Sequence, residues 1–182
     1  MQEFGIGSRV DQNKANDYYQ KAAEKGNPAA QLRLAKIFLT EFDMFGNIQA
    51  PEATATLSVS KSLGENQKMA LKMFKQAASS ENPEALATLG HIYETGGYED
   101  EKTGKFFHLL KKNIEKAMPL YAQAAEKHGS ETAFNFLGAH QYNRVGNKAQ
   151  AVTLFRQAAA CGNNARALNN LAICFEIGVG DA

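Results

Sequence analysis

The sequence predicts an all-α protein, a right-handed α/α solenoid of stacked antiparallel helix pairs. Two observations favour this fold class. Two short helical patterns, lined with alanine and glycine, recur in alternation along the 182 residues. The apolar content of 44% and the charged content of 21% are typical of a globular protein with a buried core.

The first pattern places an alanine, an aromatic residue four positions later and two further alanines on one face of a helix. Its four copies make chance a poor explanation. They are Ala15, Tyr19, Ala22 and Ala23; Ala70, Phe74, Ala77 and Ala78; Ala117, Tyr121, Ala124 and Ala125; and Ala151, Phe155, Ala158 and Ala159. From this spacing we expect Tyr18, Tyr19, Phe74 and Tyr121 to lie in the core.

The second pattern follows each copy of the first. Its members are Ala30, Leu34, Ala35 and Phe38; Ala85, Leu89, Gly90 and Tyr93; Ala133, Leu137 and Gly138; and Ala167, Leu171, Ala172 and Phe175. Small residues let two helix backbones approach closely, and one aromatic side chain fills the remaining gap. Between the first two helices, we expect Gly26 to cap one helix and Pro28 to lie in the turn or the first turn of the next.

One such helix pair cannot bury its own apolar face, so the pairs must stack into a single array over residues 1–182. We predict a partial repeat at 4–29, full repeats at 30–84, 85–132 and 133–166, and a partial repeat at 167–182. The surplus length of the first two full repeats is assigned to inserts at 43–66 and 98–112.

The insert 43–66 is rich in Ser, Thr and Ala and shows no sustained period, which predicts a mobile loop. Two readings stay open, a permissive insertion and a regulatory loop that is phosphorylated.

The insert 98–112 contains Phe106, Phe107, Leu109 and Leu110, which are too apolar for a free loop. Either the second helix of this repeat is longer and covers the core, or these side chains form an exposed docking patch. We expect Pro119 to kink or delay the helix in which it lies, because proline lacks a backbone N–H.

The last pattern, with Leu168, Leu171 and Phe175, has no following helix to cover it. The chain starts at a Gly-x-Gly turn, Gly5 and Gly7, and stops after a second such turn. We therefore expect either a fragment of a longer array or end-to-end self-association through uncapped terminal repeats.

These patterns resemble the Sel-one-like repeat family of the tetratricopeptide-like superfamily. The stretch ALATLGHIYETGG at 85–97 is similar to the first half of the family's repeat, and GIGSRVDQNKANDYYQKAAEKG at 5–26 is similar to the second half. Gln141 departs from the family pattern, which has tyrosine there. The resemblance implies an adaptor or scaffold role in signalling or complex assembly.

The net charge of +1, with acids and bases mixed along the chain, gives no electrostatic footprint for nucleic acid or an anionic membrane. No apolar run reaches the length of a transmembrane helix. Cys161 and Cys174 are too few for a disulfide framework, and we expect both to be reduced, small, buried residues. A cytoplasmic location is expected, with the nucleus as the alternative.

The sequence contains no catalytic constellation that we recognise. The TGK stretch at 103–105 lacks the earlier glycine and the following Ser or Thr of a phosphate loop. The four histidines have no Cys or Asp at metal-ligand spacing. We therefore predict no catalytic, cofactor-binding or metal-binding residue, and a protein that is not an enzyme.

In solenoids of this kind the first helix of each repeat lines the concave side. The helical offsets then place Lys36, Ala87, His91, Glu94, Asn135, Tyr142, Asn169 and Glu176 on that side. Asn135 and Asn169 occupy equivalent positions in successive repeats. They form either a clamp for an extended peptide backbone or merely two tolerated surface amides.

The leading hypothesis is a protein–protein interaction scaffold or adaptor that binds a peptide or a protein domain on its concave face. The alternative is a regulatory or targeting repeat segment of a larger multidomain protein or enzyme whose catalytic part lies in other sequence. The identity of the partner protein is not readable from the residues.

Overall fold

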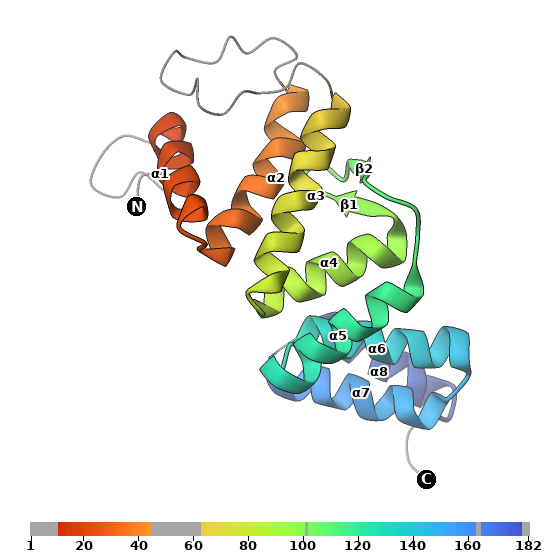
Figure 1. Cartoon of the computed structure of the whole chain (residues 1–182). Helices are drawn as coiled ribbons and strands as arrows, with labels where there is room; N and C mark the ends of the chain where they lie inside the picture. The colour runs from red at the N-terminus through yellow and green to blue at the C-terminus, as the bar shows by residue number, and fades with distance from the viewer. Residues whose placement is uncertain (1–10, 45–62, 101, 163–164, 180–182) are drawn as a thin grey trace.

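The chain folds into a stack of helices whose two ends lie at opposite ends of the array (Figure 1). The computed structural model describes residues 11–44, 63–100, 102–162 and 165–179. Its elements are α1 (Gln12–Glu24), α2 (Pro28–Met44), α3 (Leu63–Ser79), α4 (Pro83–Thr95), β1 (Gly97–Glu99), β2 (Phe106–His108), α5 (Ile114–His128), α6 (Glu131–His140), the π-helical turn η3 (Gln141–Val145), α7 (Lys148–Cys161) and α8 (Ala165–Glu176). The predicted all-helical solenoid is confirmed.

The helices pack most extensively in pairs, α2 with α3, α4 with α5 and α6 with α7. Each pair also contacts its neighbours along the chain, while α1 lies on α2 and α8 lies on α7. Because the main contacts of the described helices are with elements close to them in sequence, the core is an elongated series of local clusters.

Asparagine side chains cap the beginnings of α2, α4, α5 and α7. Asn27, Asn82, Asn113 and Asn147 each accept a hydrogen bond from the backbone N–H three residues later, at 2.9–3.1 Å. Such caps satisfy backbone donors that have no partner inside the helix. The spacing of the apolar residues did not reveal them.

The turn between α1 and α2 has the predicted form. Gly26 adopts a left-handed backbone conformation with φ of 83° just after α1, and Pro28 is the first residue of α2. Glycine tolerates this conformation because it has no Cβ, and proline is favoured at the first helical position. The expectations for both residues are confirmed.

The predicted aromatic core is correct for Phe74 and Tyr121, which are fully buried, and Tyr19 is half-buried against α2. Tyr18 is 60% exposed, so its assignment to the core was wrong. Successive residues point about 100° apart around a helix, and α1 packs mainly against α2 among the described elements. The side chain next to Tyr19 therefore points to solvent.

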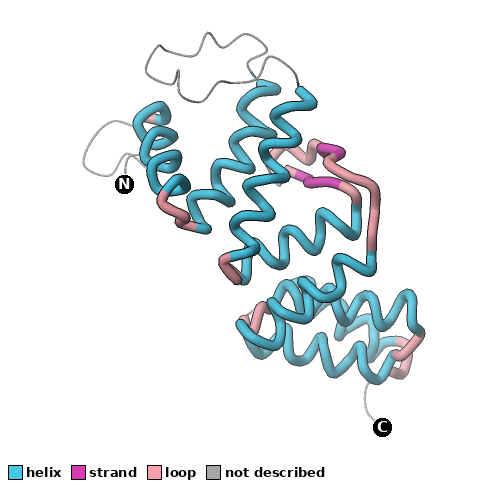
Figure 2. Tube along the Cα trace, viewed as in Figure 1, coloured by secondary structure: helices cyan, strands magenta, loops and turns pink. Residues whose placement is uncertain are grey.

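The insert 98–112 forms a β-hairpin, so the prediction of a longer helix is wrong. β1 pairs antiparallel with β2, with Tyr98 opposite Phe107, and Figure 2 shows the two short strands beside α3. Both side chains are buried, and the Tyr98 ring lies 5.6 Å from that of Phe74. Phe106 points the other way and is 36% exposed, as the alternation of a strand requires.

The turn of this hairpin explains why the segment does not continue as a helix. The Thr103 backbone N–H and hydroxyl both donate to Asp100 Oδ2, at 3.0 and 2.6 Å. A side chain that bonds the backbone in this way favours a turn over a helix. Leu109 and Leu110 then pack against the core, so a docking patch made of all four apolar residues is also ruled out.

Two boundary predictions are corrected by the helix limits. α2 continues to Met44 and α3 begins at Leu63, so both ends of the insert 43–66 are helical. The predicted loop between them, and the turn with Gly5 and Gly7, lie outside the described residues. α5 begins five residues before Pro119 and continues past it, capped by Asn113, so proline does not delay this helix.

The two cysteines are free, as predicted, but their environments differ. Cys174 is buried between α8 and α7, whereas Cys161 is exposed at the last position of α7. The expectation that both are buried is therefore wrong for Cys161. Among the described helices, none combines the length and the apolar character that a membrane crossing requires.

Candidate interaction surface

The alternate helices α2, α4, α6 and α8 are connected by one side-chain pair at each step. We call the surface that these helices form the even-helix face. The pairs, from α2 to α8, are Lys36 with Glu84, His91 with Phe136, and Asn135 with Asn170. Each pair joins residues from two repeats, so the face is continuous along the array.

The centre of the even-helix face is an aromatic stack. The Phe136 ring stacks with the imidazole of His91 and with the ring of Tyr121, and both pairs of centroids are 5.0 Å apart. The interplanar angles are 28° and 19°, which describe stacked rings. The stack ties α4, α5 and α6 together.

A carboxylate lies beside this stack and contacts two of its members. The Tyr121 hydroxyl donates a hydrogen bond to Glu94 Oε2 at 2.8 Å. His91 Nδ1 lies 3.8 Å from the same oxygen, within ion-pair range when the imidazole is protonated. Glu94 is half-buried, so its carboxylate keeps contact with solvent while its direction is set by Tyr121.

These contacts shift the ionisation of both groups. The pKa of the Glu94 carboxyl is held below its usual range, first by the interaction with His91 and, against the opposing effect of burial, by the Tyr121 hydrogen bond. Burial, together with the negative charge of Glu94, raises the pKa of the Tyr121 hydroxyl. At neutral pH the Glu94 carboxylate is therefore anionic and accepts the hydrogen bond, whereas the Tyr121 hydroxyl is neutral and donates it.

Two imidazole nitrogens nearby, Nδ1 of His91 and Nδ1 of His140, are buried and have no hydrogen-bond partner within the described ranges. Buried polar atoms are normally paired. Proximity to the His140 imidazole also contributes to the lowered pKa of Glu94.

Asn135 does not meet Asn169. Its Oδ1 instead accepts a hydrogen bond of 2.9 Å from Asn170 Nδ2, and the residue is only 7% exposed. Asn169 is exposed on α8, one position away and about 100° around the helix. The contact between Asn170 and Asn135 was not predicted from the sequence. The peptide clamp stays a prediction, with the Asn135 oxygen already engaged.

The other predicted surface residues are spread over the array. Lys36 reaches Glu84 on α4 at 3.2 Å, and Tyr142 lies half-buried in η3 with Lys148 Nζ 5.8 Å from its ring centroid. Glu176 is exposed near the end of α8. Ala87 is buried and contributes nothing to the surface.

Several residues that complete the face do not follow from the repeating pattern. That pattern assigned Tyr121 to the core only, although the tyrosine hydroxyl reaches Glu94. Phe136 and Glu84 lie outside the repeating offsets, so spacing alone gave no reason to choose them. The residues added by the structure are Glu84, Tyr121, Phe136, His140 and Asn170.

The last helix exposes apolar side chains, as predicted for Leu168 and Phe175, which are 46% and 47% exposed. The prediction is wrong for Leu171, which is half-buried and packs against the cluster between α7 and α8. In the part of the chain that the structure describes, no three His, Cys, Asp or Glu residues are grouped so that they could hold a metal ion.

The family model for the Sel1 repeat matches residues 1–27, 59–82, 83–128, 136–163 and 165–181. A Sel1 repeat protein from Oxalobacter formigenes has a similar solved structure, with a TM-score of 0.68 and 27% sequence identity over 100% of this chain. The protein c5321, a protective antigen present in uropathogenic Escherichia coli strains that displays an SLR fold, matches 99% of this chain with a TM-score of 0.53 and 24% identity, a similarity of fold alone.

This chain spans 63% of the Oxalobacter protein structure and 40% of the Escherichia coli one. Among curated proteins, none matches the sequence significantly.

Proposed function

This chain belongs to the Sel1 repeat family, and from that premise we propose that it is a non-enzymatic scaffold or adaptor that binds a peptide or protein domain on its concave face. Proteins of this repeat class generally serve as scaffolds for protein–protein interaction. We assign the concave face to the even-helix face of α2, α4, α6 and α8.

The observation that carries this proposal is the fixed carboxylate at the centre of that face. The Tyr121 hydroxyl, whose ring is stacked on Phe136, donates to the Glu94 carboxylate and orients it before any partner arrives. A group that is already ordered loses little conformational entropy on binding, which favours affinity. Its charge suits a partner that presents an N–H donor or a cation.

The residues around this centre supply further hydrogen-bonding groups at repeat spacing. Tyr142 lies on η3, which follows α6 in the chain, and Asn169 and Glu176 are exposed on α8. An extended segment that runs along the array would meet these polar groups in turn, as peptides do in other grooves.

Affinity purification from cells, followed by mass spectrometry, tests the proposal with the whole chain as bait. A second bait carries His91→Gln and Glu94→Gln, which replace the imidazole and the carboxylate by uncharged amides of similar volume. A third bait carries Glu126→Gln and His128→Gln, two exposed residues of α5 that match the lost charges. We expect the proteins recovered by the first and third baits to be absent with the second.

Recovery of the same proteins by all three baits would contradict the role of the Glu94 centre. Thermal unfolding of the purified baits, followed by circular dichroism, shows whether the substitutions leave the fold intact. The alternative proposal, a regulatory or targeting segment of a larger protein, is distinguished by reading the open reading frame on both sides of this sequence.

A further inference from the structure

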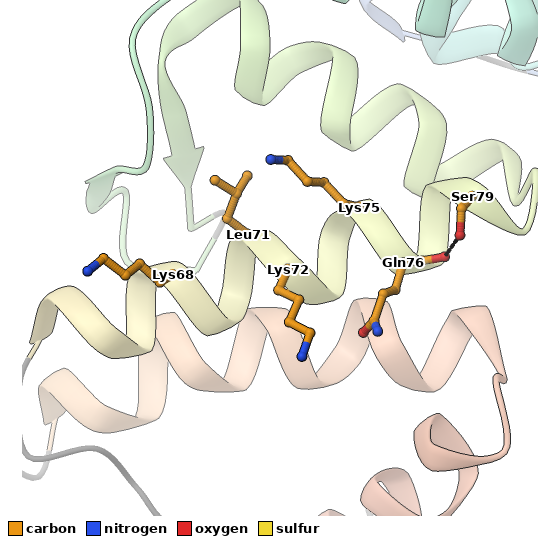
Figure 3. Close-up of a pocket in the computed structure, with 6 residues that line it drawn as sticks. All are labelled: Lys68, Leu71, Lys72, Lys75, Gln76 and Ser79. Atoms are coloured by element: carbon orange, nitrogen blue, oxygen red, sulfur yellow. Dashed lines mark hydrogen bonds between the residues drawn. The ribbon is translucent and has the colours of Figure 1, made fainter.

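A shallow groove with a volume of about 420 Å³ follows a helix that is not part of the even-helix face (Figure 3). Its lining comes entirely from α3. The lining residues are Lys68, Leu71, Lys72, Lys75, Gln76 and Ser79.

These residues recur every three or four positions, so they form one stripe along the helix. Eleven residues separate Lys68 from Ser79, which corresponds to about 16 Å at 1.5 Å per residue. An extended peptide of about five residues covers that length. The opposite side of α3 is occupied by the core residues Ala70, Phe74 and Ala77.

The positive charge of this stripe has no ion-pair partner among the described residues. Lys68, Lys72 and Lys75 form no ion pair with a carboxylate of the described residues, whereas Lys36 and Lys127 pair with Glu84 and Glu81 at 3.2 and 2.9 Å. The three ammonium groups lie within two turns of one helix, on a chain whose net charge is only +1.

The stripe also offers apolar and hydrogen-bonding contacts between its charges. Leu71 is half-buried and packs against the core, so its outer surface has a fixed position between the lysines. Gln76 presents a side-chain amide, and the Ser79 hydroxyl donates to the backbone oxygen of Gln76 at 2.7 Å. A ligand with acidic residues on both sides of one apolar residue matches this order.

From the charge and shape of this groove we propose that α3 binds an acidic segment of a partner protein, separately from the partner on the even-helix face. Nucleic acids fit less well, because their affinity rests on many neutralised phosphates and this stripe has only three lysines. An anionic membrane fits less well, because insertion needs a large exposed apolar surface and Leu71 is half-buried against the core.

Fluorescence anisotropy with a labelled probe peptide tests this proposal. The probe carries two glutamates on each side of one leucine, and its counterpart has glutamine in place of glutamate. We expect the whole chain to bind the acidic probe, with an affinity that falls as salt rises, and not to bind the uncharged one. The variant Lys68→Gln/Lys72→Gln/Lys75→Gln is expected to bind the acidic probe at least about tenfold more weakly.

A matched control removes the same charge elsewhere, with Lys25→Gln, Lys102→Gln and Lys111→Gln at three exposed positions. This control is expected to bind the acidic probe like the unmodified chain. In NMR spectra of the unmodified chain, addition of the acidic probe is expected to shift the amide signals of α3. Absence of binding to the acidic probe, or equal weakening in both triple variants, would overturn the proposal. Tighter lysine-dependent binding of single-stranded RNA or of phosphatidylserine vesicles would also overturn it, since the partner class would then be wrong.

Discussion

The ring of Tyr121 in α5 lies directly against the backbone of Gly90 in α4, so that a Cβ at Gly90 would be 2.8 Å from Tyr121 Cε1. The same relationship returns one repeat later, where a Cβ at Gly138 would be 2.6 Å from Cε1 of Phe155. Both rings are buried and cannot move aside. Glycine at these positions therefore sets the distance between the two helices of a pair.

Replacement of either glycine by alanine is expected to destabilise the protein. Alanine favours the helix by about 1 kcal/mol over glycine, but overpacking against a buried ring costs about 1–3 kcal/mol. We expect Gly90→Ala and Gly138→Ala to lower the free energy of unfolding, measured with denaturant. Gly64→Ala is the control, because nothing lies near its Cβ position in α3, and it is expected to be neutral or stabilising. Equal effects at all three sites would contradict this account.

The charge of Glu94 is expected to make stability depend on pH in acid. Folding lowers its pKa from the ordinary value of 4.5, so the unfolded chain takes up the proton more readily. The contribution of the Glu94 carboxylate to the free energy of unfolding is therefore fully present above pH 4.5. It is lost as the pH falls through the folded-state pKa. Glu94→Gln should be less stable than the unmodified chain at pH 7, by about 1 kcal/mol, and the difference should shrink as the pH falls below 4.5.

Thermal or urea unfolding at several pH values measures this difference. Glu126→Gln, at an exposed position of α5, serves as the reference for loss of a carboxylate without these contacts. A gap between Glu94→Gln and the unmodified chain that stays constant from neutral to acid pH would show that Glu94 does not act through its charge.

The two asparagines of the α8 doublet are expected to differ in their effect on stability. Asn170→Ala removes the donor to Asn135 and leaves a buried oxygen unpaired, which costs about 1–3 kcal/mol. Asn169→Ala changes an exposed side chain and should alter stability by less than about 0.5 kcal/mol. Denaturant unfolding of the two variants, side by side, measures the difference, and a larger loss for Asn169→Ala would contradict the observed pairing.

The two thiols are expected to react at very different rates in the folded protein. Cys161 is exposed, whereas Cys174 is 1% exposed and burial raises the pKa of its thiol. The thiolate is the reacting form, so Cys174 is protected by its low accessibility and by its smaller thiolate fraction. Brief treatment with N-ethylmaleimide should add one label, at Cys161, and a second label should appear only after unfolding. Mass spectrometry of the intact and digested protein locates the labels.

The hairpin and the candidate surface show where prediction from sequence stopped. The segment with Phe106 and Phe107 was correctly predicted to be too apolar for a free loop. Its apolar run is too short for periodicity to distinguish a strand from a helix. The Asp100–Thr103 turn and the site for Phe107 beside α3 decided the outcome. Likewise His91 and Glu94 were chosen from helical offsets, whereas their partners Tyr121 and Phe136 come from other helices.

The sequence by itself determined the helical pairs, the glycine and alanine positions at which they touch, and the family, because these features repeat and depend on local spacing. Only the tertiary structure decided which side chains meet across repeats, such as Asn135 with Asn170 or Tyr121 with Glu94. Such contacts depend on how each helix is rotated against its neighbour, and a difference of one residue turns a side chain by about 100°. That rotation is set by packing over the whole interface.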